Sequence, residues 1–173
     1  MISRRLILLL VTCLLMSACA ALRAGKGTKR DQPADTDANG PSFAAGAARI
    51  TDACTVMPAN LTQKIVPGGS PPQSEKFPRR CSVSNGKSVL EITIETGPIT
   101  PVDPVNGAEF IPGLAEGGYL ERLDPVAKGD SYLTVILGKD PNGLLHVEVA
   151  GHDGKDHKDD AIAVARSILG QLK

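Results

Sequence analysis

Within residues 88–96, apolar and polar side chains alternate from Leu90 to Glu95, and this pattern constrains the fold more than any other in the chain. Successive side chains of a β-strand point to opposite faces of a sheet, so the alternation predicts a half-buried strand. The apolar positions are Leu90, Ile92 and Ile94, and the polar positions are Glu91, Thr93 and Glu95.

Short connections indicate how this strand pairs with others. Asn85-Gly86 is a hairpin turn signal between the strand and a shorter one that contains Cys81. Two further strands are expected at 132–137 and 144–149, joined by a loop of six residues. Antiparallel strands can be joined by such short links, whereas parallel strands need long crossovers. The chain is therefore expected to form an antiparallel sheet.

Helical spacing of apolar residues predicts two helices, at 58–66 and 157–172. Between residues 97 and 129 frequent proline and glycine break any long element, so only a short helix at 108–111 and a strand at 119–123 are expected there. The apolar stripe of the first helix is Met57, Leu61 and Ile65, and that of the second is Ile162, Ala165, Ile168, Leu169 and Leu172.

The order of these elements predicts an α+β fold. We expect a single antiparallel β-sheet with an N-terminal and a C-terminal helix packed on one face and one disulfide.

The N-terminus has the three parts of a secretory signal. Arg4 and Arg5 precede an apolar run from Leu6 to Leu15 that is too short to span a bilayer comfortably, and small residues follow it. Ser17 and Ala18 stand directly before Cys19, whose thiol can accept lipid. We therefore expect residues 1–18 to be a lipoprotein signal peptide and Cys19 to be the lipidated residue. An ordinary cleaved signal and an uncleaved anchor are the alternatives.

Residues 19–48 are mostly small and polar, so they are expected to form a flexible tether, with the folded domain at 49–173. A coil of this length would hold the domain on the order of 30 Å from the membrane. Without its signal the chain carries 17 basic and 19 acidic residues, which argues against a nucleic-acid partner.

The fates of the four cysteines follow from the signal. Cys13 leaves with it and Cys19 takes lipid, so Cys54 and Cys81 remain in an oxidising compartment where disulfides persist. Closing a loop of this size would stabilise the fold by about 3–4 kcal/mol. We expect this bridge to join the first helix to the first strand. A metal site is the alternative, but no further ligands flank either cysteine.

Several of these residues together suggest a family. Asp52-Ala53-Cys54, Pro58 and Cys81, with Gly129-Asp130-Ser131-Tyr132 before a strand, resemble a group of actinobacterial surface lipoproteins. These proteins carry a domain of unknown function and include the LprB- and LprC-like mycobacterial proteins. The resemblance covers residues 50–172 and the lipid signal. It implies a secreted, lipid-anchored, disulfide-stapled domain, and it implies no catalytic residue or ligand.

Residues that could support catalysis or bind metal are few. Glu91, Glu95 and His146 are expected on strands, where solvated side chains are far commoner than catalytic ones. The polar run 152–160 offers His152, Asp153, Asp156 and His157 as metal ligands, but it lacks the alternating oxygen ligands and the final glutamate of a calcium loop. We expect no enzyme activity, no metal and no cofactor.

The function expected from these features is binding. A membrane-anchored extracytoplasmic module would bind an envelope protein or a small ligand, with segment 97–129 as the rim of its site. The alternative is an accessory or structural component of an envelope assembly that binds no ligand.

Overall fold

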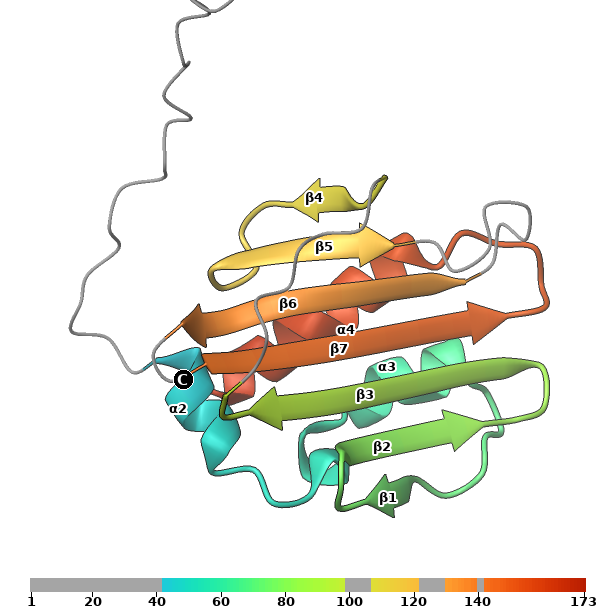
Figure 1. Cartoon of the computed structure of the whole chain (residues 1–173). Helices are drawn as coiled ribbons and strands as arrows, with labels where there is room; N and C mark the ends of the chain where they lie inside the picture. The colour runs from blue at the N-terminus through green and yellow to red at the C-terminus, as the bar shows by residue number, and fades with distance from the viewer. Residues whose placement is uncertain (1–41, 99–106, 122–129, 140–141) are drawn as a thin grey trace, which may run out of the picture. The chain divides into compact units, whose positions relative to one another are not determined.

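A computed structural model describes residues 42–98, 107–121, 130–139 and 142–173 (Figure 1). The expected signal peptide, Cys19 and the tether up to residue 41 lie outside these ranges. The described residues belong to one compact unit, Asn39–Lys173. None of their helices is long and apolar enough to cross a membrane.

Seven strands form one sheet, in the order β1-β2-β3-β7-β6-β5-β4, and every neighbouring pair is antiparallel. The predicted single antiparallel sheet is confirmed. The strands are β1 (Gln73–Glu75), β2 (Arg79–Ser84), β3 (Ser88–Thr96), β4 (Glu109–Ile111), β5 (Gly117–Glu121), β6 (Ser131–Lys139) and β7 (Asn142–Gly151).

The alternating strand is β3, at the predicted bounds, and it lies near the centre of the sheet. It pairs with β7 along its whole length, from Ser88 opposite Gly151 to Thr96 opposite Gly143. Its apolar positions are at most 1 % exposed and form part of the core, whereas its polar positions are half-buried on the other face. The period-2 pattern thus decides which face of the sheet receives the helices.

The helices are α2 (Phe43–Ala48), α3 (Ala59–Ile65) and α4 (Lys158–Gln171), with a 3₁₀ turn, η2 (Ala53–Val56). Figure 1 shows α3 and α4 behind the sheet, and α4 contacts β6 and β7 while α3 contacts β3 and α4. The two predicted helices are confirmed to within one residue at each end. The buried face of α4 is centred on Ala161, Val164, Ala165 and Ile168, so Ile162 lies at its margin rather than in its stripe.

Two expectations for the middle of the chain are corrected. The helix expected at 108–111 is instead the edge strand β4, and the strand expected at 119–123 begins two residues earlier, as β5. Strand pairing decides both cases, because Glu109, Phe110 and Ile111 bond to β5. The residues of the loop at 99–106 and 122–129 lie outside the described ranges.

The domain also begins earlier than expected. Residues 43–48, placed in the tether by their small side chains, form α2, and Ala44 and Ala47 are fully buried in the core. Small size is what permits this packing: a Cβ at Gly143 of β7 would lie 3.1 Å from the Cβ of Ala44. A composition that looks like a linker therefore belongs here to a tightly packed helix.

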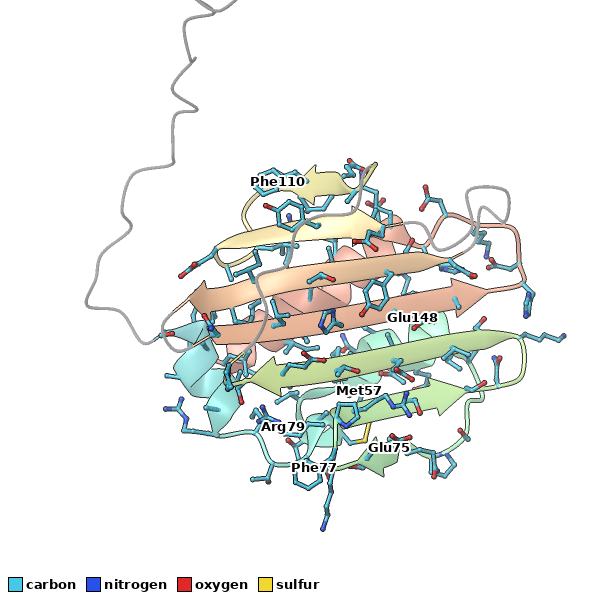
Figure 2. The ribbon with its side chains drawn as sticks, viewed as in Figure 1. Met57, Glu75, Phe77, Arg79, Phe110 and Glu148 are labelled. Atoms are coloured by element: carbon cyan, nitrogen blue, oxygen red, sulfur yellow. A yellow bond between two sulfur atoms is a disulfide. The ribbon has the colours of Figure 1, made fainter. Side chains whose placement is uncertain are left out.

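Arg79 of β2 holds the end of α2 in place (Figure 2). Its Nη1 donates to the carbonyl oxygens of Ala47 (3.0 Å) and Ile50 (2.6 Å), and its Nη2 donates to Oγ1 of Thr96 (2.6 Å). Carbonyls at a helix C-terminus lack partners within the helix and carry partial negative charge. The guanidinium donates to both carbonyls and ties the end of α2 to β2 and β3.

Candidate functional site

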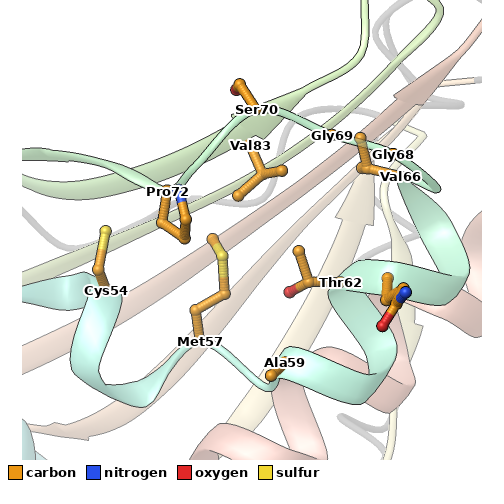
Figure 3. A pocket seen from close by; sticks show the side chains of 11 residues that line it. Cys54, Met57, Ala59, Thr62, Val66, Gly68, Gly69, Ser70, Pro72 and Val83 are labelled. Carbon is orange, nitrogen blue, oxygen red and sulfur yellow. The ribbon is translucent and has the colours of Figure 1, made fainter.

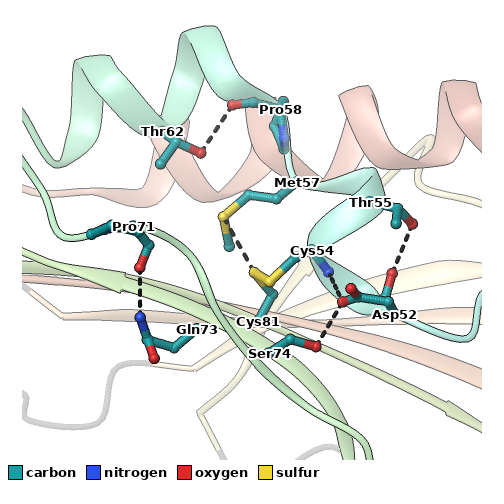
Figure 4. The surroundings of a disulfide bond; sticks show 10 residues. All are labelled: Asp52, Cys54, Thr55, Met57, Pro58, Thr62, Pro71, Gln73, Ser74 and Cys81. Atoms are coloured by element: carbon teal, nitrogen blue, oxygen red, sulfur yellow. Dashed lines mark hydrogen bonds between the residues drawn. A yellow bond between two sulfur atoms is a disulfide. The ribbon is translucent and has the colours of Figure 1, made fainter.

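The disulfide joins Cys54 of η2 to Cys81 of β2, with an S–S distance of 1.98 Å and 5.0 Å between the Cα atoms (Figure 4). The predicted pairing is confirmed, although the bridge joins the turn before α3 to the second strand, because the short β1 comes first. Asp52 caps this turn: its Oδ1 accepts from the backbone N–H of Cys54 (2.9 Å) and the hydroxyl of Ser74 (2.7 Å). These two donors lower the pKa of Asp52.

A groove of about 380 Å³ opens beside this bridge, between α3, β2 and the loop that connects α3 to β1 (Figure 3). We call it the disulfide groove. Figure 3 shows the side chains of Met57, Val83 and Pro72 around the same space. The residues that line it are Cys54, Met57, Ala59, Thr62, Gln63, Val66, Gly68, Gly69, Ser70, Pro72 and Val83.

Glycine shapes the wall that the loop provides. A Cβ at Gly69 would lie 2.7 Å from Cγ1 of Val83 and 2.9 Å from Cγ1 of Val66, so only glycine lets the loop approach β2 this closely. Two hydrogen bonds hold the approach: Ser70 N donates to the Ser84 carbonyl (2.8 Å), and Asn85 Nδ2 donates to the Pro67 carbonyl (3.0 Å).

The chemistry of the disulfide groove suits binding rather than catalysis. Its lining is mainly apolar and contains no titratable side chain, because the only thiol-bearing residue, Cys54, is in the disulfide. The lining includes the sulfur-containing residues Cys54 and Met57, and Met57 Sδ lies 3.8 Å from Cys81 Sγ. The hydroxyl of Thr62 donates to the Pro58 carbonyl at 3.0 Å and is therefore already engaged. Small-molecule sites are typically apolar concavities with a few polar groups, as here.

The candidate catalytic residues Glu91, Glu95 and His146 lie elsewhere, on the sheet face opposite the buried side of β3. His146 Nε2 is 4.0 Å from Glu95 Oε1, its Nδ1 is 3.1 Å from Thr134 Oγ1, and its ring stacks on Tyr132 with centroids 5.5 Å apart. Burial lowers the pKa of His146.

Thr134, His146 and Glu95 lie in a row, and their residue types can serve as a nucleophile, a base and an orienting group. The geometry does not match those roles. The Thr134 side chain is buried, at 3 % exposure, and the histidine-to-carboxylate distance is too long for a hydrogen bond. The row is therefore a packed polar cluster on the sheet.

Glu148 and Tyr132 belong to the same face, and sequence reasoning missed both. Glu148 pairs with Glu91 across β3 and β7, and burial, then the charges of Glu91 and Asp130, raise its pKa (Figure 2). Burial also raises the pKa of Tyr132. Glu148 alternates with apolar residues along β7, and this pattern could have indicated that its side chain lies on the outer face. Only strand pairing places it opposite Glu91.

The expected polar run 152–160 forms the turn that precedes α4 and the first residues of that helix. His157 lies between two carboxylates, with Nε2 3.1 Å from Asp153 Oδ1 and Nδ1 3.2 Å from Asp160 Oδ2, and its side chain is only 7 % exposed. Lys64 of α3 binds Asp160 at 3.0 Å. Within the described ranges no group of three or more metal-ligating side chains converges. The ion pair between Lys64 and Asp160 joins this cluster at the start of α4 to α3.

Comparison of the chain with protein-family models, curated protein sequences and solved structures returned no match. Conclusions about function therefore depend on the chemistry of the residues themselves.

Proposed function

We propose that the protein is a lipid-anchored extracytoplasmic binding module that holds a small, largely apolar ligand in the disulfide groove. The groove is the observation that carries the proposal. Its volume of about 380 Å³ falls within the range of small-molecule sites, and its lining is mainly apolar. The attachment to the membrane rests on the N-terminal signal and Cys19.

The walls of the groove are braced before any ligand arrives. The disulfide and Asp52 fix η2, and backbone hydrogen bonds fix the loop against β2. A site that is already ordered loses little conformational entropy when it binds, so a modest apolar contact can give useful affinity.

Two neighbouring residues of α3 provide a matched test. Ala59 lines the groove, whereas exposed Asn60 does not. Ala59→Leu is expected to weaken binding of a fluorescent fatty acid about tenfold, or about 1.4 kcal/mol, by filling the groove. Asn60→Leu adds the same side chain outside the groove and is expected to leave affinity unchanged.

Native mass spectrometry of the protein purified from its own membrane would identify what it carries. A bound small molecule that is lost in the Ala59→Leu variant would support the proposal. If neither a co-purified molecule nor the fatty acid binds, the accessory role in an envelope assembly replaces it.

A further inference from the structure

The turn between β1 and β2 exposes an aromatic side chain more fully than any other large apolar residue among those the structure describes. Phe77 is 95 % exposed, and the only other such residue, Phe110, is 55 % exposed and contacts Tyr119. Figure 2 shows Phe77 at the β1 edge of the sheet, pointing away from the domain, with Phe110 at the opposite edge. The fold does not use Phe77 in its core.

The charged side chains around this turn favour contact with an anionic surface. Lys76 precedes Phe77 and is exposed, and exposed Arg49 ends α2, the helix that Arg79 ties to β2. The two nearby acids are already engaged. Asp52 accepts from Ser74 and Cys54, and Glu75 binds Arg80.

We propose that the turn 76–78, which we call the aromatic tip, contacts the anionic lipid surface to which the protein is anchored. An aromatic ring beside a basic residue suits the interface between headgroups and acyl chains, where the ring is partly buried and the charge meets lipid phosphate. This inference rests on the proposed membrane attachment, and it assigns the tip an orientation toward the bilayer.

The short chain before the domain makes such a weak contact effective. One aromatic and two basic side chains cannot hold a protein on a bilayer alone. The described residues begin at 42, so 22 residues separate them from Cys19. The coil expected from the composition of these residues would span on the order of 25–30 Å and would keep the tip at a high effective concentration near the lipid.

The absence of tryptophan from the chain allows a direct test. Phe77→Trp introduces a single indole at the tip, and Phe110→Trp introduces one at the opposite edge as a matched control. Each lipidated full-length variant is reconstituted into vesicles of equal parts phosphatidylcholine and phosphatidylglycerol, and the phosphatidylcholine carries brominated acyl chains that quench nearby indoles. Flotation measures the attachment separately.

The indole at position 77 is expected to shift to the blue and to be quenched, while that at position 110 is not. Lys76→Glu in the Phe77→Trp background is expected to reduce the quenching. If the protein floats but position 77 is unquenched, or both positions are quenched alike, the tip contact is refuted and the anchor stands.

Two other outcomes separate the remaining possibilities. A blue shift at position 77 in native membranes but not in lipid vesicles would overturn the inference in favour of a protein partner. If the protein does not float, the anchor is refuted. In that case the lipid contact of the aromatic tip is tested by adding excess brominated vesicles. Quenching of the indole at position 77 would support the contact, and no quenching would refute it together with the anchor.

Discussion

Gly46 of α2 lies directly against the backbone carbonyl of Leu172, the C-cap residue of α4. A Cβ at position 46 would overlap the Leu172 carbonyl oxygen and lie 2.8 Å from its carbon. A backbone atom in a packed core cannot move aside cheaply. Gly46→Ala is therefore expected to lower the free energy of unfolding by at least about 2 kcal/mol, measured by urea denaturation.

Gly170→Ala is the control for that substitution. Gly170 is an exposed residue of α4, and nothing lies within 4 Å of the Cβ it would gain. Alanine is the better helix former, so this variant is expected to gain about 0.5–1 kcal/mol. Similar changes in the two variants would show that Gly46 is not closely packed.

Removing the Arg79 guanidinium should release the end of α2. Arg79→Met removes the side-chain donor from the carbonyls of Ala47 and Ile50, and among the described residues only that of Ala47 keeps a backbone donor, the N–H of Ile50, so the expected cost is about 2 kcal/mol. Hydrogen exchange of the amides in 43–50 should accelerate more than that of β3. Arg49→Met serves as the control, because the Arg49 side chain makes no hydrogen bond within the described ranges, and it should leave both rates unchanged.

The disulfide should contribute both to stability and to the groove. With Cys54 and Cys81 separated by 27 positions, their replacement by serine is expected to cost about 3.5 kcal/mol. The double variant should also lose affinity for the fluorescent fatty acid, since Cys54 is part of the wall. A reductant should destabilise the native protein and leave the double variant unaffected; equal sensitivity of the two would argue against a structural bridge.

The hydroxyl of Ser131 is fully buried and has no hydrogen-bond partner among the residues that the structure describes. A buried polar group in this condition destabilises the fold, so Ser131→Ala is expected to raise the free energy of unfolding by about 1 kcal/mol. On the same strand, Thr134→Val removes a hydroxyl that bonds to His146 and is expected to destabilise by a similar amount. Thermal unfolding of both variants would reveal the opposite signs.

Glu148 should make stability depend on pH. Its pKa in the folded state is raised above the reference of 4.5, so the folded state holds the proton more tightly than the unfolded state does. Its contribution is most favourable below that reference and is lost as pH rises through the folded value. Glu148→Gln should therefore raise the unfolding temperature at neutral pH and change it little near pH 4. Equal gains at both pH values would show that the carboxyl is not perturbed.

Local patterns predicted the regular elements that carry a strong periodicity. The bounds of β3 and α4 are almost as expected because each element buries one face. The spacing of the apolar residues therefore predicts which side chains are buried. The errors arise where tertiary contacts decide. Glu109, Phe110 and Ile111 have no clear period and become a strand only by pairing with β5. Ala44 and Gly46 look like linker residues, yet their small size is what lets α2 pack against β7 and Leu172.

The candidate sites also combine features that local sequence patterns predict with features that only tertiary contacts decide. The pairing of Cys54 with Cys81 was predicted by counting the thiols that remain after the expected signal processing, on the expectation of an oxidising compartment. The disulfide groove could not be foreseen, because its lining comes from a turn, a helix, a loop and a strand that meet only in three dimensions. Alternation correctly grouped Glu91 with Glu95, but the approach of His146 to Glu95 depends on the register between β3 and β7.

The two edge strands of the described sheet, β1 and β4, affect how the domain can associate with other molecules. β1 and β4 contain only three residues each, and β1 is preceded by two prolines. An incoming strand from another molecule would find too few backbone groups to form a ladder. The long, strongly apolar strands β3, β6 and β7 are meanwhile shielded in the interior of the sheet. Edge-to-edge pairing is therefore disfavoured, and we expect the folded domain to stay dispersed at high protein concentration.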